Sequence, residues 1–254
     1  MNIAFSTILV FILLLPGASF SRFYYSAEFS KQYFKSSPYE LFIAALIPSL
    51  ILHFIALLFI RYAFHYTIDI EILGLLLAGS NNHDDILRTF KAIEENLPRI
   101  VSYHFCLIPF AALVGVLGRF FVRKFKLDRR FALLRFQNEW HYIISGEILD
   151  YPGKPGGSEE IDFVYADAMV NTAEGSVIYS GIVYDYVLSK NGGLDRLYLS
   201  QVKRRFLNPG KMKDYDLQGQ VLSISNENIV NLHFTYYEIQ KIESSKTQEP
   251  SDTA

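Results

Sequence analysis

The sequence has few of the residues from which catalytic and metal sites are built. Cys106 is the one cysteine among 254 residues, so the chain can form neither an intramolecular disulfide nor a cysteine-based zinc site. It also lacks a His-x-x-x-His or His-Glu-x-x-His pair, a Gly-x-Ser-x-Gly elbow and the residue order of a phosphate loop. We therefore expect a protein that is not an enzyme and that holds no metal or cofactor.

An excess of charge of one sign is missing as well. The 24 lysines and arginines nearly balance the 26 aspartates and glutamates, which leaves a formal net charge of -2. This balance gives no reason to expect a nucleic-acid partner. The charges are nevertheless unevenly distributed, because the first 122 residues are strongly apolar and a basic segment follows them directly.

Three apolar runs in this first part, at about residues 3–20, 41–62 and 100–122, are long enough to be membrane spans. About 20 apolar residues suffice to cross the hydrocarbon core as a helix. The first run is not typical of a signal peptide, since it has no positively charged start and Gly17-Ala-Ser-Phe20 is a poor cleavage site. We predict a helical membrane domain of three spans at residues 1–122.

The basic segment at residues 123–136, called the collar below, determines the expected orientation. Lysine and arginine residues directly after a span stay on the cytoplasmic side. Three spans then put the N-terminus outside a bacterial inner membrane and the rest of the chain in the cytoplasm. Near an anionic bilayer each basic residue contributes about 1 kcal/mol of binding. The residues expected to contact lipid headgroups or a partner are Arg123, Lys124, Lys126, Arg129 and Arg130.

The segment between the second and third spans is predicted to stay outside. Residues 80–85, Ser-Asn-Asn-His-Asp-Asp, are typical of a helix start, and the apolar residues after them recur at helical spacing. They predict an amphipathic outer or interfacial helix at about residues 82–97. The apolar stretch from Ile68 to Ala78 is too short to cross the membrane and is either interfacial or re-entrant.

Two of the predicted spans contain residues that are candidates for helix packing or for function. Ala111, Gly115 and Gly118 follow one another at spacings of four and three, which predicts a helix-packing face, although a pore lining uses the same residue types. His53 lies near the middle of the second span. An ionisable side chain at that depth is a candidate functional residue, and a neutral imidazole there can also hydrogen-bond a neighbouring helix.

Beyond the collar the pattern indicates strands. Five segments rich in Val, Ile, Tyr, Phe and Leu alternate with turn residues, a short helix around Trp140 precedes them, and a polar tail at residues 243–254 is expected to be disordered. This pattern predicts a small all-β barrel at residues 137–242. The expected strands are 163–170, 176–188, 196–202, 220–224 and 229–239.

Two parts of this region resemble sequence motifs of a known protein family. Met169-Val-Asn171 ends a strand, a turn closes at Gly175, and the next strand contains Gly181; further on, Val221 to Leu232 is typical of two strands joined by a very tight turn. Over roughly residues 137–237 the chain resembles the Sm-like family of small barrels, relatives of the SH3-like folds. The resemblance implies that certain glycines serve the turns and bends of the barrel, namely Gly175, Gly181, Gly192 and Gly193.

The departures from that family concern its RNA site. RNA-binding members use an Asp and Asn pair and an Arg-Gly dipeptide, whereas the corresponding loops here, 184–194 and 225–228, contain no Arg-Gly, and Glu227 would repel phosphate. The resemblance thus implies the fold without RNA binding. The basic residues Lys203, Arg204 and Arg205 are instead expected to contact a membrane surface or a partner.

The predicted function is therefore that of a non-enzymatic membrane protein that presents a cytoplasmic interaction barrel in an adaptor, assembly or regulatory role. Its expected partners are the lipid bilayer, anionic lipid headgroups, and either another protein or further copies of itself. The alternative is an oligomeric channel or transport component, because three spans and a small barrel are similar in architecture to mechanosensitive channels of small conductance.

Overall fold

The computed structural model describes residues 3–30, 37–67, 69–80, 82–136, 138–154, 157–173, 175–189, 192–207 and 213–239. It divides into two compact units, Met1–Asn138 and Glu139–Ala254. The division falls close to the predicted start of the barrel at residue 137. The predicted disordered tail at residues 243–254 lies outside the described residues.

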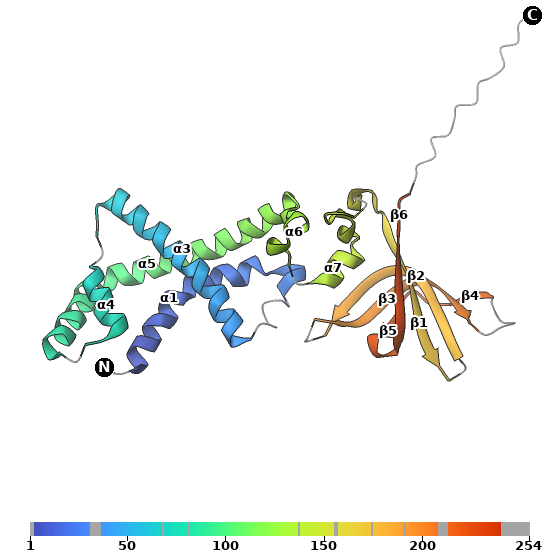
Figure 1. The fold of residues 1–254 in the computed structure, drawn as a ribbon, viewed down its shortest axis with the longest axis horizontal. Helices are drawn as coiled ribbons and strands as arrows, with labels where there is room; N and C mark the ends of the chain where they lie inside the picture. Colours follow the sequence, from blue (N-terminus) through green and yellow to red (C-terminus); the bar gives the residue numbers. More distant parts are fainter. Residues whose placement is uncertain are drawn as a thin grey trace, which may run out of the picture. The chain divides into compact units, whose positions relative to one another are not determined.

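The first unit is helical (Figure 1). Its main helices are α1 (Ile3–Tyr24), α3 (Pro38–Phe64), α4 (Ile70–Ala78) and α5 (His83–Lys124). Among the described residues, α1, α3 and α5 are long and apolar enough to cross a membrane. The three predicted spans are confirmed to this extent.

Helix α1 packs against both other long helices, and serine side chains mark the contacts. Ser21 Oγ donates a hydrogen bond to the carbonyl of Ala44 at 2.7 Å, and Ser49 Oγ donates to that of Leu13 at 2.5 Å, so α1 and α3 are antiparallel. Ser19 Oγ donates to the carbonyl of Ile108 at 3.2 Å. Because Arg119 similarly reaches Ser26, α1 and α5 run parallel, and the ends of α1 and α5 lie on the same side as the start of α3.

Helix α5 differs from the predicted division into an outer helix at 82–97 and a span at 100–122. It is one continuous helix of 42 residues with Pro98 and Pro109 inside it. At 1.5 Å per residue it is about 63 Å long, about twice the thickness of the hydrocarbon core. Each proline removes one backbone N–H from the hydrogen-bond ladder, and the helical run on both sides is long enough to absorb that loss.

Helix α4 spans nine residues, too few to cross a membrane. The Asp69 carboxylate caps its start by accepting from the backbone N–H groups of Glu71 and Ile72, and Gly79 ends it at a φ of 83°. Two contacts attach it to its neighbours: Ser6 Oγ lies 3.5 Å from the carbonyl of Leu76, and Arg88 pairs with Glu71 at 3.0 Å. The segment thus packs on the N-terminal parts of α1 and α5.

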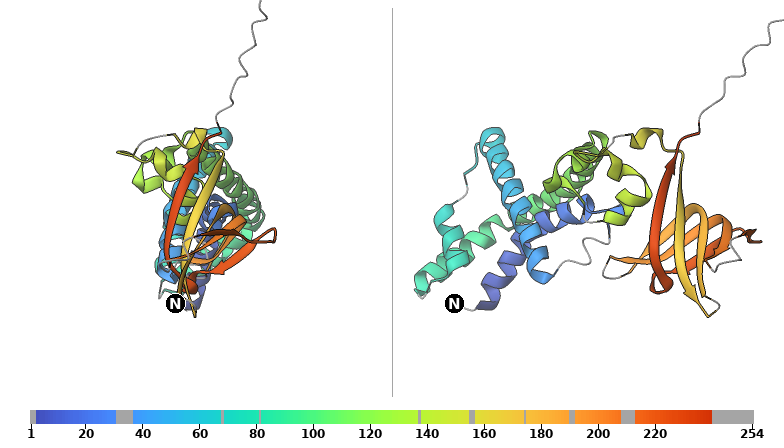
Figure 2. Two further views of the ribbon diagram at one scale, coloured as in Figure 1. Left: turned by 90° about the vertical axis from the view of Figure 1, so that its right-hand side faces the viewer. Right: turned by 45° about the vertical axis from the view of Figure 1, so that its right-hand side comes forward.

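The second unit begins with helix α7 (Glu139–Ile144) and continues as an antiparallel sheet. Its strands are β1 (Phe163–Thr172), β2 (Gly175–Leu188), β3 (Leu194–Phe206), β4 (Asp214–Asp216), β5 (Leu222–Ser225) and β6 (Ile229–Tyr237). The strand order is β4-β3-β2-β1-β6, and β5 also pairs with β3. Figure 2 shows β6 at the edge of this sheet beside β1.

The predicted small all-β barrel is confirmed only as an antiparallel sheet, because this sheet is not closed into a barrel. The expected tight turn is present as the 3-10 helix η5 (Asn226–Asn228), which links β5 to β6. Across this turn the two strands diverge, since β5 pairs with β3 whereas β6 pairs with β1. No ladder joins β5 to β6 in the described part of the chain, and closure would require one.

The core of the second unit lies on one face of the sheet. Alternate residues of β1 are buried there, and Trp140 and Ile144 from α7 pack against the same cluster. The buried residues are Ala166, Ala168, Val170, Leu194, Leu197, Leu199, Val202 and Ile224. The residues of β1 between them therefore belong to the opposite face.

A bulge bends this sheet at Gly181. The register between β2 and β3 shifts there, and Gln201 opposite has a φ of +51°. A Cβ on Gly181 would lie 2.7 Å from the carbonyl oxygen of Ser200, so only glycine fits without a shift of the backbone. Gly175 and Gly192 have φ values of 118° and 76°, which other residues rarely adopt. Gly193 has neither constraint.

Candidate functional site

A row of polar side chains crosses the outer face of the sheet. Each comes from a different strand, and successive members are cross-strand partners in the observed register. From β6 to β4 the members are His233, Asp167, Ser180, Lys203 and Asp216. This set is called the polar row below. These residues are dispersed over 67 positions of the chain, and no single local motif contains them. The register of the strands alone brings them together.

Asp167 is the centre of this row. It accepts a hydrogen bond from Ser180 Oγ at 2.5 Å, and its other oxygen lies 3.6 Å from Nδ1 of His233. The serine hydroxyl therefore donates to a carboxylate rather than to an imidazole. A serine nucleophile needs a base that removes its proton, which is the role of the histidine in a Ser-His-Asp triad. In this geometry Ser180 is a hydrogen-bond donor to Asp167, and His233 is not placed as its base.

A groove of about 560 Å³ lies beside the polar row. Its aromatic wall comes from β1 and β6, where Phe163 stacks on Tyr237 with ring centroids 5.1 Å apart and Tyr165 meets Tyr237 edge-on at 6.1 Å. Lys203 and Asp216 supply charges of both signs on the other wall. The groove therefore presents aromatic surface together with charged groups.

Tyr165, one of the two tyrosines that line the groove, is a hydrogen-bond donor at neutral pH. Partial burial, and next the negative charge of Asp167, raise the pKa of Tyr165 above its usual value of 10.0. Its hydroxyl consequently stays protonated well above neutrality, and can donate to a carbonyl or carboxylate of a ligand.

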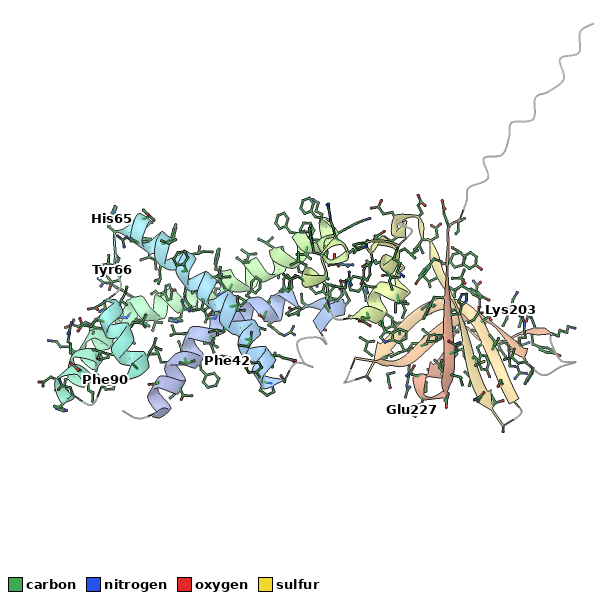
Figure 3. The ribbon with its side chains drawn as sticks, viewed as in Figure 1. Phe42, His65, Tyr66, Phe90, Lys203 and Glu227 are labelled. Atoms are coloured by element: carbon green, nitrogen blue, oxygen red, sulfur yellow. The ribbon has the colours of Figure 1, made fainter. Side chains whose placement is uncertain are left out.

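The predicted basic patch at residues 203–205 is divided by the fold. Arg205 forms a two-pronged ion pair with Asp214, with Nε and Nη2 at 2.6 and 2.9 Å from the two carboxylate oxygens. The Arg204 guanidinium lies over the Phe206 ring, 4.8 Å from its centroid. Lys203 alone of the three lines the groove. Figure 3 shows Lys203 near β4 and Glu227 at the distant turn between β5 and β6.

The basic residues of the collar are likewise divided into paired or buried ones and exposed ones. Arg123 Nη1 pairs with the fully buried Asp128 at 2.8 Å, and its guanidinium also lies over the Phe29 ring, which stacks on Phe136 at 4.1 Å. Arg129 is buried. Of the five predicted headgroup contacts, Lys124 and Arg130 are exposed, Lys126 is partly exposed, and Arg123 and Arg129 belong largely to the interior.

Exposed apolar residues around the collar escaped the sequence reasoning, which considered charge alone. Phe125, Phe131 and Leu133 are 59%, 50% and 95% exposed. Phe125 lies between Lys124 and Lys126, and Phe131 follows Arg129 and Arg130; this proximity of aromatic and basic residues was the available signal, and Leu133 had none of its own.

The predicted packing residues of the third span lie against α1. Ala111 is fully buried, and a Cβ on Gly115 would lie 2.5 Å from the carbonyl oxygen of Phe20. Gly118 faces the Tyr24 ring at an ordinary distance of 3.6 Å. A closer approach was missed at Gly17, where a Cβ would lie 1.8 Å from the carbonyl oxygen of Ala45 in α3. The small residues Gly17, Ala18 and Ser19 were the signal for this crossing in the sequence.

His53 makes contacts with both neighbouring helices. Its Nδ1 lies 2.5 Å from the Tyr103 hydroxyl of α5, and its Nε2 lies 2.9 Å from the Leu13 carbonyl of α1. His104 is close, with its ring centroid 6.1 Å from that of His53. His53, Tyr103 and His104 therefore form a polar cluster within the described part of the long helices.

In the part of the chain that the structure describes, no three His, Cys, Asp or Glu side chains converge as metal ligands would. Comparisons with models of protein families, with curated protein sequences and with solved structures find no match to this chain. Any functional conclusion therefore depends on the geometry described above.

Proposed function

We propose that this is a non-enzymatic, membrane-anchored protein whose sheet unit binds an extended segment of a protein partner. The observation that carries the proposal is the open edge of β6. Within the described residues β6 pairs with β1 alone, so a nine-residue strand has one side without a strand partner. Such an edge is a template for an additional strand.

The aromatic groove supports the same proposal. Tyr237, the last residue of β6, also forms part of the groove wall, so a strand added along β6 would end beside it. Main-chain hydrogen bonds would supply affinity, and an apolar side chain seated against Phe163 and Tyr165 would supply specificity. Lys203 and Asp216 could then orient polar groups next to that side chain.

The Sm-like relationship remains part of this proposal. It is supported by the pairing of β6 with β1 and by the single 3-10 turn that links β5 to β6. Because the sheet is open, a second copy of the chain is the other segment that could pair with β6.

The proposed setting is a bacterial inner membrane with the sheet unit on the cytoplasmic side. Support comes from the charges at the two ends of the helical unit. The ends of α1 and α5 carry Arg22, Arg123 and Lys124, whereas the first turn of α5 at the other side carries Asp84 and Asp85. An excess of basic residues next to a span favours the cytoplasm.

Site-specific photocrosslinking of the full-length protein in cells would test the binding proposal. A photoreactive residue at Val230, which is 55% exposed on β6, should crosslink to one defined protein or to a second copy. The same residue at Tyr184, which is 69% exposed on β2, serves as the matched control and should not. Tyr165→Ala should reduce the Val230 product, and equal products at both positions would contradict the proposal.

An oligomeric transport component is the second candidate function. It is favoured by one observation, the polar cluster around His53 within helices that are apolar enough to span a membrane. Three helices of one chain cannot enclose a pore, so this function requires an oligomer. A mass measurement of the detergent-solubilised protein that finds only monomer would exclude it.

A further inference from the structure

A pocket of about 510 Å³ lies between the end of α1 and the start of α3. The two helices cross at Gly17, which meets the backbone of Ala45 and Ser49, and they separate from there toward the end of α1 and the start of α3 (Figure 1). The pocket occupies the angle between them. It therefore opens at the ends of two helices that are long and apolar enough to cross a membrane.

The lining of this pocket changes from polar to apolar along α3. Tyr39 and Glu40, in the first turn of the helix, line one end. Ile43, Ile47 and Pro48 line the other end. From Tyr39 to Pro48 the helix rises by about 14 Å, at 1.5 Å per residue. A phospholipid has the same order of polarity, and the polar end of the pocket lies where the apolar run ends and headgroups begin.

Aromatic rings form the wall of the polar end opposite α3. The Tyr24 and Tyr25 rings meet at 84° with centroids 5.0 Å apart, and Tyr24 also stacks on Phe20 at 5.7 Å. Both tyrosine rings contact the ring of buried Phe136, at 5.3 and 6.1 Å. The wall is therefore held in place before a ligand binds, which lowers the entropy that binding costs.

Glu40 determines which charge the polar end accepts. Its Oε2 accepts from the backbone N–H of Ser37 at 2.9 Å, and the Ser37 hydroxyl accepts from the backbone N–H of Glu40. This capping box, together with Pro38, which has no N–H, leaves few backbone donors for an anion at the start of α3. The carboxylate has lone pairs for further donors, so with the aromatic rings it favours a cation that carries N–H groups.

We propose that this pocket binds a phospholipid whose headgroup ends in a primary ammonium, as in phosphatidylethanolamine. The ammonium donates to Glu40 beside the tyrosine rings, and the start of one acyl chain lies along Ile43 and Ile47. Basic residues at this end of the helices, such as Arg22, attract the phosphate that all phospholipids share, so selectivity comes from the ammonium. The inference rests on the membrane anchor in the proposed function and is independent of what the sheet unit binds.

Native mass spectrometry of the full-length protein tests this selectivity. The protein is purified in detergent from the membrane fraction and incubated with equal amounts of phosphatidylethanolamine and phosphatidylglycerol that carry the same acyl chains. We expect the one-to-one complex with phosphatidylethanolamine to exceed that with phosphatidylglycerol by about tenfold, the effect of one hydrogen bond between charged groups.

Two pairs of variants locate the site. Glu40→Gln removes the charge and keeps the capping box, because glutamine also accepts at this position, so the preference should disappear. Glu28→Gln, which removes an exposed charge just after α1 and outside the pocket lining, should keep it. Ile47→Trp at the apolar end should reduce both complexes, whereas Ile51→Trp, one turn further along α3 and outside the lining, should not.

The possible failures are distinct. The inference is overturned if the wild-type protein retains neither lipid or both equally, if the preference persists in Glu40→Gln, or if Ile47→Trp leaves both complexes unchanged. Absence of the protein from the membrane fraction would contradict the membrane anchor itself, and the lipid site with it.

Discussion

Glycines at helix crossings determine how closely the long helices approach. Gly17 in α1 lies against the backbone of α3, and Gly115 in α5 lies against the backbone of α1. At both positions the nearest atoms are main-chain atoms, which cannot move aside as a flexible side chain can. The helices must separate if either position gains a side chain, and the serine hydrogen bonds between them would lengthen.

Gly115→Ala is therefore expected to destabilise the helical unit by about 1–3 kcal/mol, the usual cost of overpacking. A denaturant titration of helical circular dichroism in detergent would measure this change. Gly74→Ala is the control, because nothing lies within 4 Å of a Cβ at Gly74 in α4. That substitution should be neutral or stabilise by up to about 1 kcal/mol through helix propensity. Similar losses for both variants would show that the crossing at Gly115 is not tight.

At the scale of elements, the collar combines an interior and an exterior. The pair of Arg123 with buried Asp128 and the stack of Phe29 on Phe136 form its interior. Lys124, Arg130 and three apolar side chains form its exterior. Directly after a helix that is long and apolar enough to cross a membrane, such a surface is suited to the boundary between headgroups and acyl chains.

Leu133→Trp should consequently report contact with lipid. Leu133 is 95% exposed, so the substitution adds a fluorophore without disturbing a core. In bilayers that contain brominated lipids, the added fluorescence should be quenched strongly. Tyr184→Trp on the exposed part of β2 is the control and should be quenched less. Equal quenching at both positions would contradict the membrane contact of the collar.

Strand β4 is a second element whose behaviour can be predicted. It has three exposed residues, and Asp214 pairs with Arg205 of β3. The hydrogen bond from Arg205 holds the pKa of Asp214 below its usual value of 3.8. A lowered carboxyl pKa contributes stability above the unfolded value, and that contribution is lost as the pH falls through the folded value.

We therefore expect faster amide hydrogen exchange in β4 on acidification below about pH 4, relative to the intrinsic rate. Asp214→Asn should show fast exchange of β4 already at neutral pH and little further change on acidification. Asp195→Asn, an exposed substitution near the start of β3, is the control and should leave β4 unchanged. Slow exchange of β4 in Asp214→Asn would show that the ion pair does not hold this strand.

At the scale of the whole molecule, the uneven distribution of charge supports the proposed orientation. The basic residues of the collar follow the last long apolar helix, and the acidic start of that helix lies at its other end. Orientation during insertion responds to lysine and arginine near the ends of spans, whether or not these residues later become buried.

Replacing Arg123, Lys124, Lys126, Arg129 and Arg130 together with glutamine should thus weaken or invert the orientation. A reporter fused after residue 239, which is active only in the cytoplasm, would measure the outcome. Replacing Lys203, Arg204 and Arg205, which are distant from any span in sequence, is the matched control and should not change it. A firmly cytoplasmic reporter in the collar variant would mean that other features orient the chain.

The sequence by itself determined which segments are long and apolar enough to span a membrane, the starts of five strands to within two residues, and the tight turn at residues 226–228, because these features depend on local periodicity and turn residues. The short strand β4 was not predicted. Three features were decided only by tertiary structure. Helix α5 continues through Pro98, the sheet stays open between β5 and β6, and the polar row gathers residues from five strands.

The physical reason is the range of the interactions. Whether Arg123 faces lipid or Asp128, and whether Arg205 is a free cation or the partner of Asp214, depends on which groups the folded chain brings within hydrogen-bond distance. The contacts of His53 likewise depend on other segments, so the sequence of its own helix does not decide whether it is a functional residue or a packing residue. Its partners are the carbonyl of Leu13 and the hydroxyl of Tyr103, which only the packing of three helices brings to it.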